Sequence, residues 1–164
     1  MTKTNKIIAG IVVVAVLIIG IGYAAIQNIT LNIAGTASAD ANQANFTVAF
    51  SGTPEVSEAD KVKAAVTDDL NATLNVTGLT AKGDVVTATY TIQNTSADLS
   101  ANLYATVTND NTEYFKVTHS FDAESIAKGA ATTITVTVEL IKTPITETVS
   151  STVGVQITAE PVQP

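Results

Sequence analysis

The side chains best suited to chemistry in this chain are few and far apart. Its single histidine, His119, lies between Val117 and Phe121 in a segment where apolar residues alternate, which places it on one face of a predicted strand. A histidine there could act as a general base or bind a metal, but no second histidine and no cysteine exists to join it. We therefore predict that His119 is a strand residue, and that the protein has no catalytic residue, no metal site and no cofactor.

Acidic residues form two small groups. Asp68 and Asp69 are adjacent, and Asp110 lies close to Glu113. A pair of loop carboxylates could hold a calcium ion together with backbone carbonyl oxygens. Neither group has the spacing of a calcium-binding loop. We therefore predict that both groups are solvated turns.

The composition excludes further kinds of chemistry. The absence of cysteine rules out disulfides, thiol nucleophiles and iron–sulfur clusters, and neither a G-x-S-x-G elbow nor a phosphate-binding loop occurs. The 164-residue chain has a net charge of −7, with eight lysines and no arginine, whereas nucleic-acid binding needs a basic surface. We predict a protein that is not an enzyme and does not bind nucleic acid.

Five Asn-x-Ser/Thr sequences are candidate N-glycosylation sites: Asn28, Asn45, Asn71, Asn75 and Asn94. They are relevant only in an exported protein. A chain rich in asparagine and threonine produces several by chance, so their use depends on the glycosyltransferase of the producing cell.

The elements that position these residues begin with a long apolar segment. Residues 7–26 read IIAGIVVVAVLIIGIGYAAI and contain no charge, and Lys3 and Lys6 precede them. A basic start followed by an apolar run is typical of a signal peptide or of a membrane anchor. In both cases the lysines hold the N-terminus in the cytoplasm, so the rest of the chain is expected outside the cell or on its surface.

Signal peptide and anchor are distinguished by cleavage. The length of the segment favours an anchor, which needs about 20 apolar residues. The small residues near its end favour cleavage between Ala24 and Ala25. We predict cleavage at this site, so that residues 1–24 are a signal peptide and residues 25–164 are the exported domain; a retained anchor is the alternative.

Alternating apolar and polar residues dominate the remaining chain. Residues 132–140 read TTITVTVEL, in which every second residue is apolar, and threonine and valine suit a half-buried strand. The same alternation predicts strands at residues 28–34, 45–50, 73–76, 85–93, 102–108, 115–121 and 152–158. Polar turns separate these segments. About eight short strands with such turns predict an all-β, antiparallel sandwich.

Three shorter segments need a separate interpretation. In residues 57–66, Ser57 and Asp60 could cap a helix, but the apolar residues alternate and favour a strand. Residues 51–54, SGTP, predict a turn. Residues 160–164 predict a polar tail.

Two stretches of the chain carry a family resemblance. The apolar leader ends in GYAA and is followed at once by IQNITLNIAGTASADANQANFTVAFSG. Further on, LTAKGDVVTATYTIQNTSADLSANLYATVTN has a turn at Gly83 and Asp84 before a strand that ends at Asn94. These stretches resemble the exported proteins grouped with camelysin and the biofilm fibre protein TasA. The resemblance covers most of the chain and rests on short motifs.

The resemblance implies both a fold and a function. It implies a jelly-roll or Greek-key sandwich, processed by a signal peptidase, that polymerises with itself into biofilm-matrix fibres or pilus-like filaments. The mature N-terminal strand would be donated to a neighbouring subunit, and segment 26–36 offers Ile29, Leu31 and Ile33 on one face for that purpose. Camelysin has been called a metalloprotease, but this chain lacks the H-E-x-x-H motif.

Two alternatives stay open. The N-terminal strand could pair within its own sandwich instead of with a neighbour. If the apolar segment is retained, the protein would be a membrane-tethered cell-surface module for binding or adhesion, and the membrane would be contacted through that segment alone.

Overall fold

The structure, a computed structural model, describes residues 13–20 and 46–162. Within these ranges the chain is all-β, with no helix, which confirms the predicted class. There are ten strands in the described part rather than about eight: β1 Val13–Gly20, β2 Val48–Val56, β3 Val62–Asp68, β4 Asn71–Val76, β5 Val85–Asn94, β6 Ser100–Asn109, β7 Phe115–Phe121, β8 Ser125–Ile126, β9 Ala131–Leu140 and β10 Ser151–Val162.

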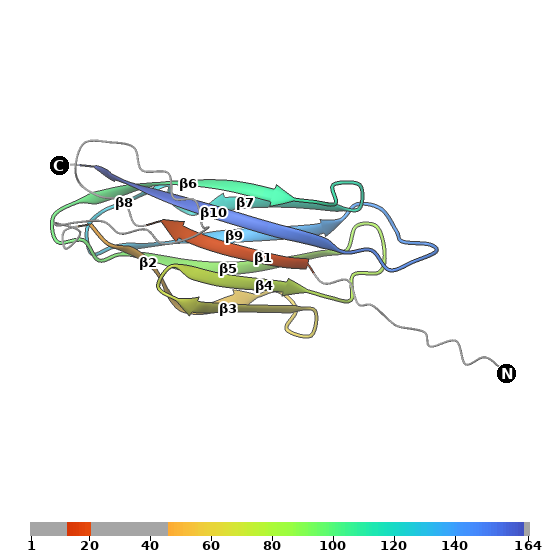
Figure 1. The fold of residues 1–164 in the computed structure, drawn as a ribbon. Helices are drawn as coiled ribbons and strands as arrows, with labels where there is room; N and C mark the ends of the chain where they lie inside the picture. Colours follow the sequence, from red (N-terminus) through yellow and green to blue (C-terminus); the bar gives the residue numbers. More distant parts are fainter. Residues whose placement is uncertain (1–12, 21–45, 163–164) are drawn as a thin grey trace.

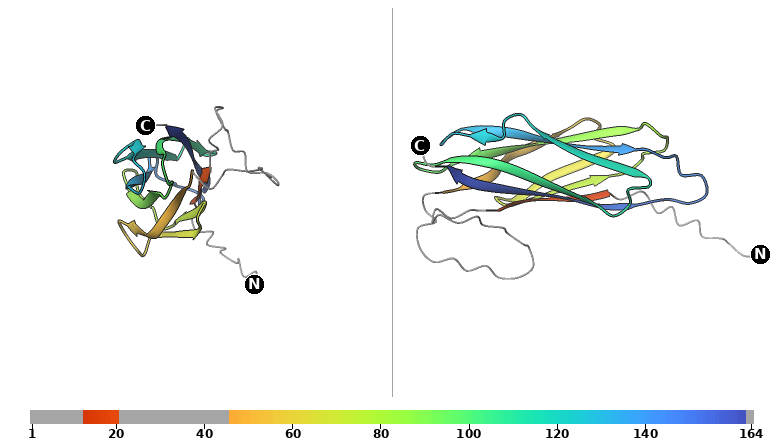
Figure 2. Two further views of the ribbon diagram at one scale, coloured as in Figure 1. Left: turned by 90° about the vertical axis from the view of Figure 1, so that its left-hand side faces the viewer. Right: turned by 90° about the horizontal axis from the view of Figure 1, so that it is seen from above.

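The strands form two sheets that pack on each other as an elongated sandwich (Figures 1 and 2). One sheet has six strands in the order β3-β4-β1-β10-β6-β8, and the other has four in the order β2-β5-β9-β7. Neighbouring strands are antiparallel, with one exception among the described strands: β1 runs parallel to β10. The predicted antiparallel sandwich is therefore confirmed for every other pair.

Alternating residues fill the space between the sheets. In β9, Ile134, Val136, Val138 and Leu140 are completely buried, whereas the threonines between them are half-buried on the outer face. The largest fully buried side chains are Tyr90, Phe46, Phe115, Leu74, Leu79, Ile92, Leu103, Ile134, Leu140 and Ile157. This one-sided burial is what a two-residue period predicts for a strand.

Residues 57–66 form a turn followed by a strand. The backbone N–H of Val62 donates to the carbonyl of Glu58 at 2.8 Å, which closes the turn, and β3 begins at Val62. Ser57 does not cap a helix, because its hydroxyl accepts a hydrogen bond from the backbone N–H of Thr87 on β5 at 2.9 Å. The strand prediction is thus confirmed from Val62 onward.

The turn predicted at residues 51–54 is wrong. Strand β2 continues through this segment, and its register against β5 shifts between Ser51 and Glu55. Gly52 has a φ of 71°, a left-handed conformation that glycine adopts without steric cost. Because β2 is an edge strand, an irregularity with glycine and proline is tolerated there.

The polar tail predicted from residue 160 onward is also wrong over its described part. Strand β10 extends to Val162, and Glu160, Pro161 and Val162 are register partners of the first residues of β6. A polar sequence becomes a strand here because a distant strand offers it a pairing edge, and this is information that the local pattern does not carry.

The central part of the predicted leader is a strand of the sandwich. Residues 13–20 form β1, which lies between β4 and β10 in the six-stranded sheet (Figure 1). The cleavage site at Ala24 and Ala25 and the strand predicted at residues 28–34 lie outside the described residues. Among the described residues, the structure has no helix of the length and apolar character needed to span a membrane.

Candidate functional site

The most distinctive feature of the six-stranded sheet is the position that β1 fills, which we call the β4–β10 slot. β1 pairs antiparallel with β4, from Val13 with Val76 to Ile18 with Asn71. It also pairs in parallel with β10 along its whole length. Because strands lie about 4.8 Å apart, the two walls of the slot stand roughly twice that distance apart, and one strand joins them.

The β10 wall of the slot is held in place independently of β1. On its other side, β10 pairs with β6 from Val153 opposite Asn109 to Val162 opposite Ser100. This ladder is longer than the one with β1. The wall therefore keeps a complete set of neighbours on the side that faces away from the slot.

The β4 wall is fixed from inside the sandwich. Tyr90 projects from β5 in the other sheet, and its hydroxyl donates to the backbone carbonyl of Thr73 on β4 at 2.9 Å. Tyr90 is completely buried, and this burial raises the pKa of its phenol, so the hydroxyl stays protonated and remains a donor. The hydrogen bond ties β4 to the opposite sheet without involving β1.

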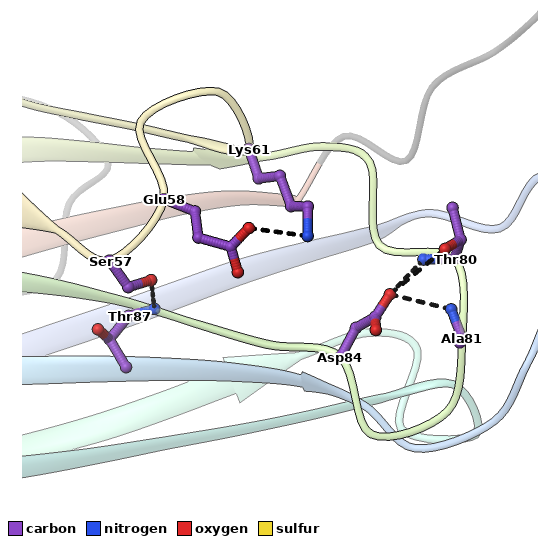
Figure 3. A network of polar contacts seen from close by, with 7 residues as sticks. All are labelled: Ser57, Glu58, Lys61, Thr80, Ala81, Asp84 and Thr87. Atoms are coloured by element: carbon purple, nitrogen blue, oxygen red, sulfur yellow. Dashed lines mark hydrogen bonds and ion pairs between the residues drawn. The ribbon is translucent and has the colours of Figure 1, made fainter.

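The β3–β4 hairpin is also attached to the other sheet at its ends. The backbone N–H of Phe50 on β2 donates to the carbonyl of Asp69 in the hairpin turn at 2.8 Å. At the other end, in the turn that leads into β3, the Ser57 hydroxyl accepts a hydrogen bond from the Thr87 backbone N–H at 2.9 Å (Figure 3). The Ser57 backbone N–H donates to the Thr87 carbonyl at 3.0 Å. One wall of the slot is therefore a hairpin of the six-stranded sheet whose two ends are hydrogen-bonded to the four-stranded sheet.

The loop from β4 to β5 is closed by Asp84. Its carboxylate accepts hydrogen bonds from the backbone N–H groups of Ala81 at 3.0 Å and Thr80 at 2.7 Å, and these bonds lower the pKa of Asp84 (Figure 3). Nearby, Lys61 and Glu58 form an exposed ion pair at 2.8 Å. Exposed pairs of this kind contribute little to stability. The hydrogen bonds of Asp84 therefore hold the loop in its conformation.

The residues along the two walls specify the character of the strand between them. Inward positions are apolar and buried: Ala72, Leu74 and Val76 on β4, and Val153, Val155 and Ile157 on β10. Outward positions, apart from Gly154, are polar: Asn71, Thr73 and Asn75 on β4, and Thr152, Gln156 and Thr158 on β10. The slot therefore fits a strand with apolar residues facing the core and polar residues facing outward.

Asn75 reveals a mismatch in the slot. It is the register partner of Lys63 on β3 and of Val14 on β1. Its Oδ1 is buried without a hydrogen-bond partner, and among the described residues no other buried side-chain oxygen or nitrogen is in this state. A valine carries no hydrogen-bond donor, and an unpaired buried carbonyl costs about 1–3 kcal/mol. In the sequence, Asn75 is marked only as a glycosylation candidate, since only the register shows what lies beside it.

His119 lies in β7, the edge strand of the four-stranded sheet, and is half-buried. Its ring meets the ring of Phe121 edge to face, with the centroids 5.9 Å apart. Within the described ranges, no group of three or more histidine, cysteine, aspartate or glutamate side chains could hold a metal ion. The histidine is thus a strand residue, as its spacing indicates.

Asp68 and Asp69 form the β3–β4 turn. The Asp68 carboxylate accepts hydrogen bonds from the side-chain amide of Asn71 at 2.7 and 2.8 Å and from the backbone N–H of Leu70 at 2.8 Å. The bond from Asn71 is the main reason that the pKa of Asp68 is lowered. These contacts close a tight turn, as predicted.

Asp110 and Glu113 serve the turn between β6 and β7. The Asp110 carboxylate accepts from the Ser151 hydroxyl at 2.8 Å and from the Thr152 backbone N–H at 2.7 Å, and both bonds lower its pKa. Glu113 pairs with Lys142 instead. The two acidic residues therefore bind different protein groups and do not converge on one site.

The glycosylation candidates differ in their accessibility. Asn94 is completely buried, and its side-chain amide donates to the carbonyls of Leu99 at 2.9 Å and Ile126 at 3.3 Å. A glycan on Asn94 would break both bonds, so this candidate does not fit the folded domain. Asn71 and Asn75 are half-buried on β4, and Asn28 and Asn45 lie outside the described residues.

Comparisons with known protein families, with curated proteins and with solved structures found no match. The strongest geometric feature is a strand-shaped slot with two fixed walls and an imperfectly matched occupant.

Proposed function

We propose that the protein is an exported structural subunit, without enzymatic activity, that polymerises head to tail into extracellular filaments of the biofilm-matrix or pilus type. The observation that carries this proposal is the β4–β10 slot. Its occupant, Val13–Gly20, comes from the segment predicted to be removed as a signal peptide. Cleavage between Ala24 and Ala25 would empty the slot.

An empty slot is not a stable arrangement. It would uncover the inward apolar residues of both walls, and burying one such side chain stabilises a fold by about 1.5–3 kcal/mol. It would also leave two facing strand edges with unpaired N–H and C=O groups. A replacement strand would restore both the apolar cover and the two hydrogen-bonded ladders.

The chain carries a suitable replacement directly after the cleavage site. Segment 26–36 becomes the N-terminus of the processed protein, and Ile29, Leu31 and Ile33 alternate along it. Each copy thus has one strand to donate and one slot to fill. If the strand enters the slot of a second copy, the contact is head to tail and does not close, so it produces a filament.

The connections between strands support the proposed jelly-roll or Greek-key topology. β10 lies beside β6 in one sheet, and β7 lies beside β9 in the other. β6, which has only the two-residue β8 beyond it, approaches the edge strand β7 of the facing sheet. The order β10-β6-β7-β9 brings the last of these strands beside the first, and this order supports a Greek-key arrangement. A camelysin- or TasA-like family assignment belongs to the same proposal and rests on the sequence motifs.

Two measurements test this function. Protein that starts at Ala25 is expected to form filaments visible by electron microscopy, and deletion of residues 26–34 is expected to abolish them. A monodisperse monomer at high concentration, unchanged by that deletion, contradicts the proposal. Mass spectrometry of the native protein gives the second test, since a start at Ala25 supports release, whereas an intact Met1 favours the membrane-tethered surface module.

A further inference from the structure

We propose that Asn75 makes the β4–β10 slot selective for the strand at residues 28–34 of a second copy, and that β1 is a placeholder which this strand replaces. This inference rests on the proposed function. It adds the residue that discriminates between the two strands, the register of the incoming strand and a role for the leader.

The sequence of β1 lacks the alternation of apolar and polar residues that both walls of the slot have. Its sequence, VVAVLIIG, is apolar at both alternating sets of positions. The outward register pairs of β1 and β4 join an apolar residue to a polar one: Val14 to Asn75, Val16 to Thr73 and Ile18 to Asn71. The unpaired oxygen of Asn75 lies at the first of these pairs.

Residues 28–34 have the alternation that β1 lacks. They read NITLNIA, with isoleucine or leucine at every second position and asparagine or threonine at three of the positions between. A shift of fourteen residues aligns them with the slot, because Leu31 then takes the position of Leu17 and Ile33 that of Ile19. The same shift brings Asn28 to the position of Val14, directly beside Asn75.

An asparagine beside Asn75 supplies the missing donor. Residues opposite each other on antiparallel strands have Cβ atoms about 4.5–5.5 Å apart, within reach of a bond between two short amides. The Asn28 side-chain N–H can thus donate to the Asn75 Oδ1. The next asparagine of the strand, Asn32, would lie beside Asn71, whose amide already donates to Asp68. The difference between β1 and residues 28–34 as occupants of the slot therefore lies mainly beside Asn75.

This arrangement gives the leader a second role. Before cleavage, β1 covers the apolar walls and keeps the slot closed to other chains. Cleavage frees the donor strand and removes the placeholder in the same step. The better-matched strand then holds the slot, so unprocessed protein does not enter filaments.

A double-mutant cycle tests the contact between Asn28 and Asn75. Protein that starts at Ala25 is prepared as wild type, Asn28→Val, Asn75→Val and the double variant, and the critical concentration for filament formation is measured by sedimentation. Each single variant leaves one buried amide unpaired, and we expect its critical concentration to rise about tenfold. The double variant removes both amides, and we expect it to return to within about threefold of wild type.

Asn32→Val is the matched control. It makes the same chemical change on the same strand beside Asn71, which already has its partner. We expect a critical concentration within about twofold of wild type and no coupling to Asn75→Val. Additive effects of Asn28→Val and Asn75→Val would overturn this inference. The proposed function would still stand in that case, provided that the wild-type protein forms filaments.

Disulfide trapping tests the register and the exchange between copies. The chain has no cysteine, so one preparation carries Asn28→Cys and the other Asn75→Cys. Mixed filaments are expected to give a disulfide-linked dimer, because strand neighbours lie within the 4.4–6.8 Å that a disulfide spans between Cα atoms. Asn32→Cys, four residues along the strand, is expected to give none.

The outcomes separate the two proposals. A bond that forms only when both cysteines are in one chain overturns the exchange between copies, and filaments without any bond overturn the slot as the acceptor. If wild-type protein starting at Ala25 forms no filaments at all, the proposed function fails, and this inference fails with it.

Discussion

The two sheets of the sandwich are built from the same Thr/Val alternation but differ in how they are completed. In the four-stranded sheet, all strands come from residues 48–140, and each pairs antiparallel with its neighbours. Polar side chains on its outer face also pair with each other, since the Thr89 and Thr135 hydroxyls form a hydrogen bond at 3.0 Å. In the six-stranded sheet, β3 and β4 are joined to β10, β6 and β8 through β1.

This difference shows that strand order, rather than composition, decides which sheet depends on the N-terminal segment. Every strand of the four-stranded sheet pairs with a strand from residues 48–140. The six-stranded sheet consists of two parts that are each well anchored but that need one more strand between them. The following predictions test this contrast.

The largest effect is expected from removing every strand that could fill the slot. Deletion of residues 1–34 takes away both β1 and the predicted donor, and it should remove most of the unfolding free energy, which is about 5–15 kcal/mol for a typical domain. Urea denaturation measures the loss, and an apolar dye reports the uncovered walls. Deletion of residues 1–12 keeps β1 and serves as the control; equal urea midpoints for the two deletions would contradict the contrast.

Substitutions in the two sheets should separate stability from assembly. Ile134→Ala in β9 and Leu74→Ala in β4 each truncate a buried side chain, and both should lower the unfolding free energy of the full chain by about 2–5 kcal/mol. Only Leu74 lines the slot. Under conditions in which both processed variants remain folded, filament yield should fall for Leu74→Ala and stay near wild type for Ile134→Ala.

Asn75→Val should have the unusual effect of stabilising the unprocessed chain. It removes a buried oxygen that has no partner while β1 occupies the slot, so we expect a gain of about 1 kcal/mol. For a domain of this size that corresponds to a melting temperature higher by about 2–4 °C. Asn71→Val is the matched control and should destabilise, because it deletes the bonds to Asp68; a loss in both variants would show that Asn75 is not mismatched.

The smallest effect concerns the turns that bracket the slot. Hydrogen bonds lower the pKa of Asp68, Asp84 and Asp110 below the ordinary value of 3.8. A carboxylate with a lowered pKa in the folded state stabilises the fold above its unfolded pKa, and this contribution disappears as the pH falls through the folded value. The melting temperature should therefore fall as the pH is lowered below about 4. Asp84→Asn should flatten part of that decline, and an unchanged profile would contradict the assignment of this carboxylate.

Much of the candidate site could not be predicted, because it depends on long-range register. Asn94 shows why: its sequence marks a glycan acceptor, but the amide binds the carbonyls of Leu99 and Ile126 inside the fold. Asn75 has the same sequence motif, and its unpaired oxygen becomes visible only when Val14 is placed beside it. Two asparagines with the same Asn-x-Ser/Thr pattern thus have different roles, because the residues beside them in the fold are distant in the chain.

The alternating pattern alone was enough to predict most of the strands between residues 62 and 158 and the face that each of them buries. It could do so because a strand alternates with a period of two residues, and this period is local. Contacts between distant segments place β1 between β4 and β10, carry β2 past Gly52 and extend β10 to Val162. These outcomes depend on which distant edge is free to pair, and hydrogen bonds between strands carry no trace in the local pattern of either strand.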